Sequence, residues 1–295
     1  MPAPKMHADE IATDVALVRR LLAAQLPQWA ALPLAPVASS GTDNALYRLG
    51  DDLVVRLPRI AGAVGQIAKE HRWLPRLAPQ LPLAIPVPLA QGTPAEGYPL
   101  PWSVYRWLAG EEATLARIPD PRVLATELAV FIAALQRIDP TDGPPSSRGG
   151  PLAARDTTVR SALAALDGLI DTGAALAAWE TALGVPVWSG PPVWSHGDLQ
   201  AGNLLLAGGR LSAVIDFGCL GVGDPACELI VAWNLLPPDA RAVFRVALVV
   251  DDATWARGRG WALSIALIAL PYYRHTNPIV AEQSRRTIAA VLAEE

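Results

Sequence analysis

The spacing of apolar and polar positions divides the chain into an early helix, a run of short strands and a longer helical part. Apolar residues recur at helical spacing over residues 9–26, and the pattern ends near Pro27. From Leu34 the pattern changes to short extended segments that are separated by polar, glycine-containing turns. The sequence therefore predicts a packing helix that is followed by a small sheet.

Strands and helices are expected in the same way along the rest of the chain. Residues 81–101 are rich in proline, which favours extended structure over helix. Residues 139–151 are rich in proline, glycine and serine and are expected to form a loop. The expected strands are 45–49, 53–57 and 102–107, and the expected helices are 64–77, 121–138, 157–183 and most of the chain after Leu229.

A further β-hairpin is expected between two polar motifs. Leu204–Leu206 and residues 211–215 have strand character, and they flank the turn Ala207-Gly208-Gly209-Arg210. Such a hairpin returns the chain to its starting point. Asp216, directly after the second strand, is therefore expected beside Asn203, directly before the first.

These polar motifs hold the residues that moving a phosphoryl group to a hydroxyl requires. One carboxylate must orient the acceptor and take its proton, and oxygen ligands must hold Mg²⁺. Asp198 lies five residues before Asn203, a spacing in which the aspartate faces the acceptor and the asparagine turns back to the metal. Asp216 supplies the second metal ligand. Each motif alone is better explained as an ordinary turn, but their order and the hairpin between them favour a phosphoryl-transfer site.

The motifs resemble those of a known family. His196-Gly197-Asp198-Leu199, followed by Asn203 and then by Ile215-Asp216-Phe217-Gly218, is similar to the pattern of the aminoglycoside phosphotransferase family of antibiotic and small-molecule kinases. Gly223-Asp224-Pro225-Ala226-Cys227-Glu228-Leu229 resembles a later segment of that family, with Glu228 where aspartate is commoner. In the family the histidine has a structural role, so we expect His196 to fix the loop.

The resemblance implies an α+β, bilobal, protein-kinase-like fold, with a small N-terminal lobe built on an antiparallel sheet and a mostly helical C-terminal lobe. The expected division is a nucleotide-binding lobe at 1–102, a hinge at 103–110 and a lobe at 111–295 with the catalytic loop and the acceptor pocket. Family likeness also implies that hinge backbone groups near Arg106 and Leu108 bind the purine, and that the insertion before the catalytic loop helps to enclose the acceptor.

The remaining candidate nucleotide-binding residues lie in the expected small lobe. A polar loop with Ser40, Gly41, Thr42 and Asn44 is suited to phosphate contact, although an ordinary hairpin turn would look the same. Arg56 stands where kinase-like folds carry the cation that holds the phosphates, and Glu70 stands at the place of its helical partner.

Arginine at this position departs from the usual lysine. It is chemically adequate, because it is a permanent cation with forked donors. Val54-Val55-Arg56-Leu57-Pro58-Arg59 also looks like a strand motif of macrolide kinases in the same family. The alternative is a solvent-facing strand arginine. The only lysines are Lys5 and Lys69, and Lys69 is expected at the surface, since one helical position turns it about 100° from Glu70.

Composition narrows the classes of partner. The 295 residues carry a net charge of −4 with a pI near 5.6, which gives no basic footprint for nucleic acid. The longest apolar run, 261–273, is too short to span a bilayer, and acidic residues stand where a signal peptide needs an apolar region. Cys219 and Cys227 lack neighbours for a zinc site. We expect a cytoplasmic protein, with no nucleic acid, membrane or protein partner implied.

The predicted function is that of a small-molecule O-kinase that uses Mg²⁺ and ATP or GTP. The short link from Phe217 to Gly223 leaves no room for an activation segment that would hold a peptide. Acids and arginines balance over 228–295, with seven of each, which weakens a polycationic acceptor, whereas four acids between 156 and 180 argue the other way. An antibiotic of aminoglycoside, macrolide or nucleoside type is expected, with resistance as the outcome. The alternatives are a metabolic kinase of a sugar, choline or amino alcohol, and a catalytically silent nucleotide-binding module.

Overall fold

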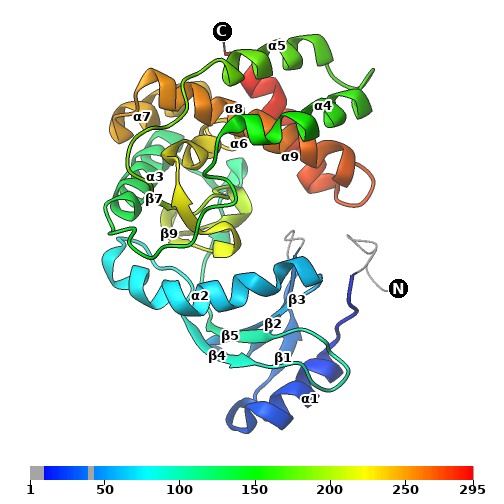
Figure 1. Ribbon diagram of the computed structural model, residues 1–295. Coiled ribbons are helices and arrows are strands. Elements are labelled where there is room, and N and C mark those ends of the chain that lie inside the picture. Colours follow the sequence, from blue (N-terminus) through cyan, green and yellow to red (C-terminus); the bar gives the residue numbers. More distant parts are fainter. Residues whose placement is uncertain (1–9, 39–42, 295) are drawn as a thin grey trace.

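The computed structural model describes residues 10–38 and 43–294. A five-stranded antiparallel sheet with the order β1-β2-β3-β5-β4 forms one end of the molecule (Figure 1). Its strands are β1 (Leu34–Pro36), β2 (Asn44–Leu49), β3 (Leu53–Pro58), β4 (Pro88–Gly92) and β5 (Trp102–Arg106). The tight turn at Gly50, which has φ +57, joins β2 to β3, and the register pairs Leu46 with Arg56. The strands predicted at 45–49, 53–57 and 102–107 are therefore present.

Two helices lie on opposite sides of this sheet. Helix α1 (Val15–Gln25) begins where Asp14 caps it, with Asp14 Oδ1 accepting from the Leu17 N–H at 2.7 Å. Helix α2 (Val64–Leu77), as predicted over 64–77, lies between the sheet and the helical part of the molecule (Figure 1). It buries Glu70 among apolar residues of the same face. This placement brings a charged side chain to the junction between the two parts.

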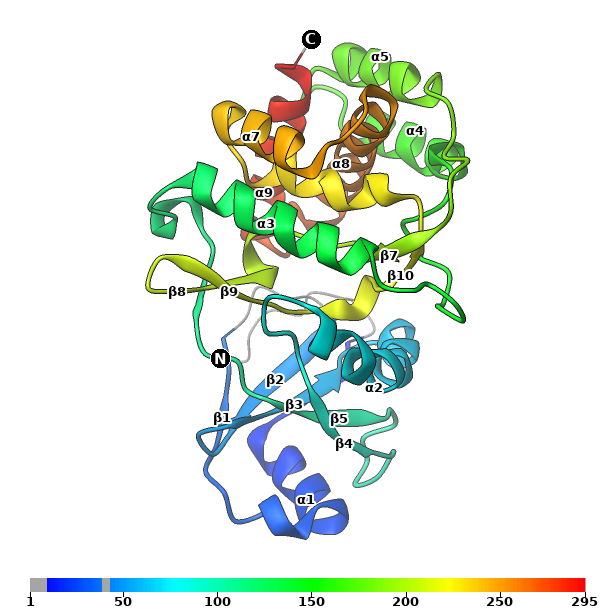
Figure 2. The same cartoon turned by 90° about the vertical axis from the view of Figure 1, so that its left-hand side faces the viewer.

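The helical part holds α3 to α9 and two small sheets (Figure 2). One sheet has the order β6-β8-β9 and the other pairs β7 with β10. The strands are β6 (Glu111–Glu112), β7 (Val193–Ser195), β8 (Leu204–Ala207), β9 (Arg210–Val214) and β10 (Gly221–Gly223). The helices are α3 (Pro121–Gln136), α4 (Asp156–Ala165), α5 (Thr172–Leu183), α6 (Val231–Asn234), α7 (Pro238–Leu248), α8 (Asp252–Tyr273) and α9 (Pro278–Leu292).

The prediction of one helical stretch over 157–183 was wrong. The chain leaves the helix at residues 166–171, where Gly168 has φ +72, and α5 restarts with Asp171 accepting from the Ala174 N–H at 2.9 Å. Strand β6 was not anticipated either. Two residues with acidic side chains give no apolar alternation, and only the pairing with β8 makes them a strand.

Two apolar cores hold these parts together. The smaller lies between α1 and the five-stranded sheet, and its members run from Leu17 to Val104. The larger fills the helical part, and it also takes in Trp73, Leu74 and Leu77 of α2 together with Tyr105. Helix α2 is thus anchored in the helical core while its Glu70 faces β3. The division at residues 103–110 stays a prediction. No helix among the described residues is long and apolar enough to cross a membrane.

Candidate functional site

Residues 196–203 form a loop between β7 and β8 at the junction of the two parts. Gly197 has φ +80, and a Cβ there would stand 3.0 Å from the Cys219 carbonyl oxygen, so glycine is required. Ser195 on β7 pairs with Gly221 on β10. The loop is therefore held from one side by the segment that follows Asp216.

His196 fixes the loop from within. It is fully buried, with its Nε2 2.9 Å from the Ile215 carbonyl oxygen and its Nδ1 accepting from the Asp198 N–H at 3.1 Å. These contacts assign the proton to Nε2. Burial lowers the pKa of His196, and Phe217 packs edge-on against the ring with centroids 4.6 Å apart. A neutral, enclosed imidazole with both nitrogens used fits the expected structural role.

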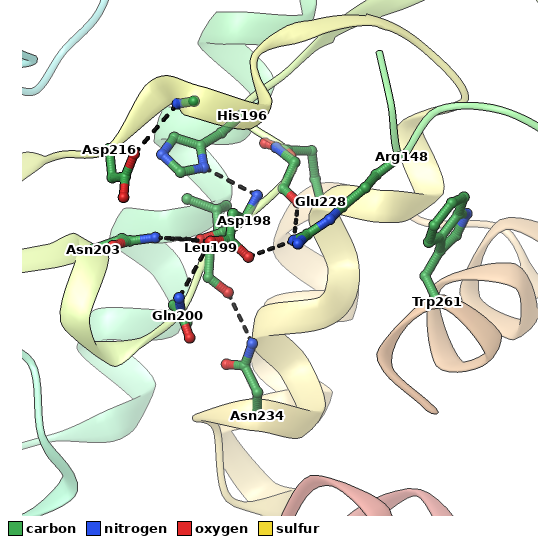
Figure 3. Close-up of polar contacts among 12 residues, drawn as sticks. Arg148, His196, Asp198, Leu199, Gln200, Asn203, Asp216, Glu228, Asn234 and Trp261 are labelled. Atoms are coloured by element: carbon green, nitrogen blue, oxygen red, sulfur yellow. Dashed lines mark hydrogen bonds and ion pairs between the residues drawn. The ribbon is translucent and has the colours of Figure 1, made fainter. Parts of the chain in front are cut away.

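Asp198 and Asn203 are joined directly, in agreement with their spacing. The Asn203 Nδ2 donates to the Asp198 carbonyl oxygen at 2.8 Å and to Asp198 Oδ2 at 3.3 Å (Figure 3). The Gln200 side chain also donates to Oδ2, at 3.2 Å. Since its amide nitrogen is used in this way, Asn203 has its amide oxygen left for another partner.

Asp216 reaches the same place through the β8–β9 hairpin. The Ile215 N–H donates to the Asn203 carbonyl oxygen at 2.8 Å, which closes the hairpin as predicted. Asp216 has φ +62 and ψ +72, a left-handed conformation that a residue other than glycine rarely adopts. Its side chain is 40% exposed, and it lies on the same side of Asp198 as Asn203 (Figure 3).

The donor set of Asn203 and Asp216 fits Mg²⁺. An amide oxygen and a carboxylate with an oxygen that faces solvent are hard ligands, and Mg²⁺ needs only one or two from the protein when phosphates supply the rest. Among the described residues no group of three or more histidine, cysteine, aspartate or glutamate side chains could hold a metal ion. That composition disfavours a zinc-type site and leaves the asparagine–aspartate pair.

Arg56 and Glu70 form the ion pair that the sequence predicts. Arg56 Nη1 lies 2.7 Å and 2.8 Å from the two carboxylate oxygens of Glu70, and Arg56 Nη2 lies 3.3 Å from Asp216 Oδ1. Gln66 and the Tyr105 hydroxyl also contact this pair. Burial alone would lower the pKa of Arg56, but the charges of Glu70 and Asp216 raise it above its usual value. The alternative of a solvent-facing Arg56 is excluded.

The other candidate nucleotide contacts are placed unevenly. Ser40, Gly41 and Thr42 lie outside the described residues. Asn44 is buried at the start of β2, and its Oδ1 has no partner among the described residues. The N–H of Arg106 donates to the Val87 carbonyl oxygen at 3.0 Å and is therefore not available to a purine.

Lys69 departs from its expected surface position. Its Nζ donates to the Gly218 carbonyl oxygen at 2.7 Å, and burial lowers its pKa. The helical rotation does carry it away from Glu70, but that direction faces the segment after Asp216 and not solvent. Lys69 thus connects α2 to the helical part.

The sequence did not predict the contacts of two further side chains at the site, Arg148 and Glu228. Arg148, in the loop 139–151, forms an ion pair with Asp198 Oδ1 and donates to the Gly197 carbonyl oxygen at 2.9 Å (Figure 3). Glu228 is fully buried and accepts from the Gly197 N–H at 2.6 Å. Burial raises the pKa of Glu228 to about 7. Its position in a motif had been noted from the sequence, but no signal gave its partner.

Comparison with known proteins gives the family of the chain. The model of a family described as the phosphotransferase enzyme family matches residues 35–261. A search of curated proteins finds no match.

Solved structures of similar fold include three phosphotransferases. The chain is 18% identical to an aminoglycoside 2″-phosphotransferase IIIa in complex with GDP and kanamycin, with a TM-score of 0.74 over 94% of this chain and 99% of that one. It is 23% identical to the macrolide 2′-phosphotransferase MphH from Brachybacterium faecium, with a TM-score of 0.62 over 96% and 99%. It is 16% identical to an ADP-bound aminoglycoside 2″-phosphotransferase Ib, with a TM-score of 0.62 over 94% and 98%. These likenesses confirm the bilobal, kinase-like fold.

Proposed function

This chain belongs to the phosphotransferase enzyme family, and we propose that it transfers the terminal phosphoryl group of ATP or GTP to a hydroxyl group of an antibiotic, which confers resistance. The observation that carries the proposal is one hydrogen-bonded network. Asn203 bonds Asp198, the hairpin end bonds Asn203, and Arg56 reaches Asp216 from the sheet. A base, a metal-ligand pair and a phosphate cation thus share one junction.

The residues have distinct roles in the proposed reaction. Asp198 accepts the proton of the acceptor hydroxyl while the oxygen of that hydroxyl forms a bond to the terminal phosphorus. The bond between that phosphorus and the bridging oxygen breaks, which releases the nucleoside diphosphate. Arg56, braced by Glu70, holds the phosphates. Asn203 and Asp216 would hold Mg²⁺, which when bound neutralises phosphate charge.

The donor is proposed to lie between residues 1–102 and 111–295, against the hinge 103–110. Among similar folds, one structure is a GDP complex and another is ADP-bound, which supports a nucleoside triphosphate as donor. The backbone N–H of Leu108 has no hydrogen-bond partner among the described residues, unlike that of Arg106. We therefore propose that Leu108, with Asn44 and the loop at 40–42, contacts the nucleotide.

The acceptor is proposed to be a hydroxylated antibiotic of aminoglycoside, macrolide or nucleoside type. One of the similar structures contains kanamycin, and another is a macrolide 2′-phosphotransferase. The strand motif Val54–Arg59 resembles that of macrolide kinases. A macrolide is therefore the first acceptor to test.

The test compares the wild-type protein with Asp198→Asn. We expect Mg²⁺-dependent release of ADP or GDP with at least one of kanamycin, gentamicin, streptomycin and erythromycin, together with a phosphate gain in the mass of that antibiotic. The asparagine keeps the size of the side chain but cannot take a proton, so turnover should fall by about 10³-fold. Growth of a susceptible host that expresses either protein should show the same difference.

Two outcomes would contradict the proposal. If no antibiotic gains phosphate but choline, an amino alcohol or a sugar does, the protein is a metabolic kinase. If nucleotide raises the unfolding temperature equally with and without Mg²⁺, and nothing is phosphorylated, it is a silent nucleotide-binding module. Retained turnover in Asp198→Asn would remove that residue from the role of base.

A further inference from the structure

The loop 139–151 presents a guanidinium group to the carboxylate that the reaction needs. The loop is fixed to the helical part, because the Ser146 N–H donates to the Val222 carbonyl oxygen and the Asp224 N–H donates to the Gly149 carbonyl oxygen, both at 2.9 Å. The Arg148 N–H in turn donates to Ser146 Oγ at 3.1 Å. The loop segment that carries Arg148 is therefore held in place by backbone hydrogen bonds.

The contacts of Asp198 leave little room for an incoming hydroxyl. One carboxylate oxygen, Oδ2, accepts from Gln200 and Asn203, and the other, Oδ1, is paired with Arg148 Nη1. An acceptor hydroxyl must therefore bind Oδ1 beside Arg148. The two side chains are each 24% exposed, so this pair remains accessible from solvent.

Arg148 has further donors at the same place. Its Nη1 donates to Asp198 and to the Gly197 carbonyl oxygen. Its Nε and Nη2 have no acceptor among the described residues, and both atoms are open to solvent. A guanidinium fork offers these donors to an oxygen acceptor in a fixed geometry. The part of the acceptor molecule that lies next to its reacting hydroxyl would thus face Arg148, whose Nε and Nη2 are free to donate.

A second arginine, Arg155, follows this loop in the chain. Arg155 donates from Nε to Ser264 Oγ at 3.1 Å, and its guanidinium carbon lies 5.2 Å from the centre of the Trp261 ring. Burial, and after it the charge of Arg148, lowers the pKa of Arg155. Two cations are therefore close enough to interact.

Most of the acids of this part of the chain are engaged with other protein groups. Asp156 and Glu180 both contact Arg160, Asp171 caps α5, and Asp224 pairs with Arg257 at 2.7 Å. A receptor for a polyamine needs carboxylates aimed at the ligand. Three of the four acids between 156 and 180 are therefore engaged with protein groups, and Asp167 is the one that is exposed without a contact among the described residues, so these acids give a polycationic acceptor little support.

We propose that Arg148 is a specificity-determining residue: it holds Asp198 and offers its free donors to an uncharged or anionic oxygen beside the acceptor hydroxyl, and it disfavours polycationic acceptors. This inference rests on the proposed kinase function. An ammonium group placed against the unused donors of Arg148 would meet a like charge in a partly buried site, where such contacts are costly.

The experiment uses Arg148→Gln and Arg148→Lys, with Arg160→Gln as the matched control. Arg160 is also an arginine paired with carboxylates, but it is exposed on α4 and its contacts are Asp156 and Glu180. Steady-state kinetics are measured with erythromycin, which has one amine, and with kanamycin, which is a polyamine. Kanamycin binding is measured separately by calorimetry without nucleotide.

Wild-type protein should favour erythromycin. In Arg148→Gln we expect kcat for erythromycin to fall by about 10-fold, because Asp198 loses its partner, and the KM and Kd for kanamycin to fall by about 10-fold, because the repulsion is removed. Arg148→Lys should keep the poor binding of kanamycin, since it keeps the charge. Arg160→Gln should change neither acceptor. A uniform loss in Arg148→Gln, without this opposite response, would indicate a merely structural role and overturn the proposal.

Two further results would also overturn it: kanamycin as the preferred wild-type acceptor, or a kanamycin Kd that is the same in wild type and Arg148→Gln. The calorimetric comparison does not need turnover. If no acceptor is phosphorylated by the wild-type protein, the kinase function fails, while the binding comparison still decides the role of the Arg148 charge.

Discussion

Two arginine–carboxylate pairs meet at the junction, and they differ in how closed they are. In the Arg56–Glu70 pair the side chains are 8% and 1% exposed, and Gln66, Tyr105 and Asp216 complete the contacts of the pair. In the Arg148–Asp198 pair both side chains are 24% exposed, and the arginine keeps unused donors. The first pair is more enclosed by protein than the second, whose arginine keeps unused donors.

This difference in exposure indicates that the first pair supports the structure and that the second can take part in the reaction. Charges that are enclosed together depend on each other, because the loss of one leaves the other without water or counter-charge. A half-open pair can exchange a protein partner for a ligand at little cost, because water screens it. The nucleotide side of the junction is therefore built as a rigid support, and the acceptor side as a site whose contacts are completed by its ligand.

The largest expected effect is on the enclosed pair. Glu70→Gln should lower the free energy of unfolding by about 3–5 kcal/mol, because it leaves the buried Arg56 with Asp216 as its nearest charge. Arg148→Gln should lower it by no more than about 1 kcal/mol. Urea unfolding followed by circular dichroism measures both. Arg122→Gln, which breaks an exposed pair with Asp239, is the control and should change stability little. Equal losses for Glu70→Gln and Arg148→Gln would remove the distinction.

The next effect concerns the carboxylate behind the half-open pair. Burial raises the pKa of Glu228 from 4.5 to about 7, so the folded protein holds a proton there that the unfolded chain releases. The contribution of Glu228 to stability should therefore be highest near the lower value, fall as pH rises from about 4.5 to 7, and level off above, whereas His196, whose pKa is lowered by burial, contributes a slope of the opposite sign. The difference amounts to about 3 kcal/mol at most.

Glu228→Gln should remove this slope, because the amide oxygen can still accept from the Gly197 N–H but does not titrate. Glu282→Gln on α9, where the carboxylate is exposed and lies 3.7 Å from Arg285, is the matched control and should keep the slope. Unfolding free energies at intervals between pH 5 and pH 8 give the comparison. If the stability of the wild-type protein and that of Glu228→Gln changed with pH in the same way, another group would be responsible.

The same contrast explains how far the sequence could predict this molecule. Strands β2, β3 and β5 and helices α2 and α3 follow from apolar periodicity and from turn residues, which are local signals. The Arg56–Glu70 pair could be predicted because a strand and the following helix place the two residues in a fixed relation.

Arg148 could not be found in this way. It stands in a loop without periodicity, and its partner is 50 positions away. Only the backbone bonds that fix this loop to β10 set its direction. The contact between Glu180 and Arg160 could not be found either, because it joins α5 to α4 and depends on the turn between the two helices. The side of the junction with the Arg148–Asp198 pair depends on contacts between residues far apart in the sequence, and the sequence pattern does not predict such contacts.

The smallest effect tests Lys69, a second cation that joins the two sides beside Arg56. Lys69 on α2 donates to the Gly218 carbonyl oxygen, two residues after Asp216. Lys69→Met keeps the length of the side chain but removes this bond, so we expect a loss of about 1 kcal/mol in unfolding free energy and a few-fold weaker binding of nucleotide with Mg²⁺. Binding without Mg²⁺ should change less, because the bond positions Asp216 and not the sheet. Arg72→Met removes an exposed cation from the same helix, one that lies 5.0 Å from the centre of the Trp73 ring, and it should leave nucleotide binding unchanged with and without Mg²⁺. If Lys69→Met weakened nucleotide binding equally with and without Mg²⁺, Lys69 would contact the phosphates itself, and the nucleotide side would hold two cations instead of one.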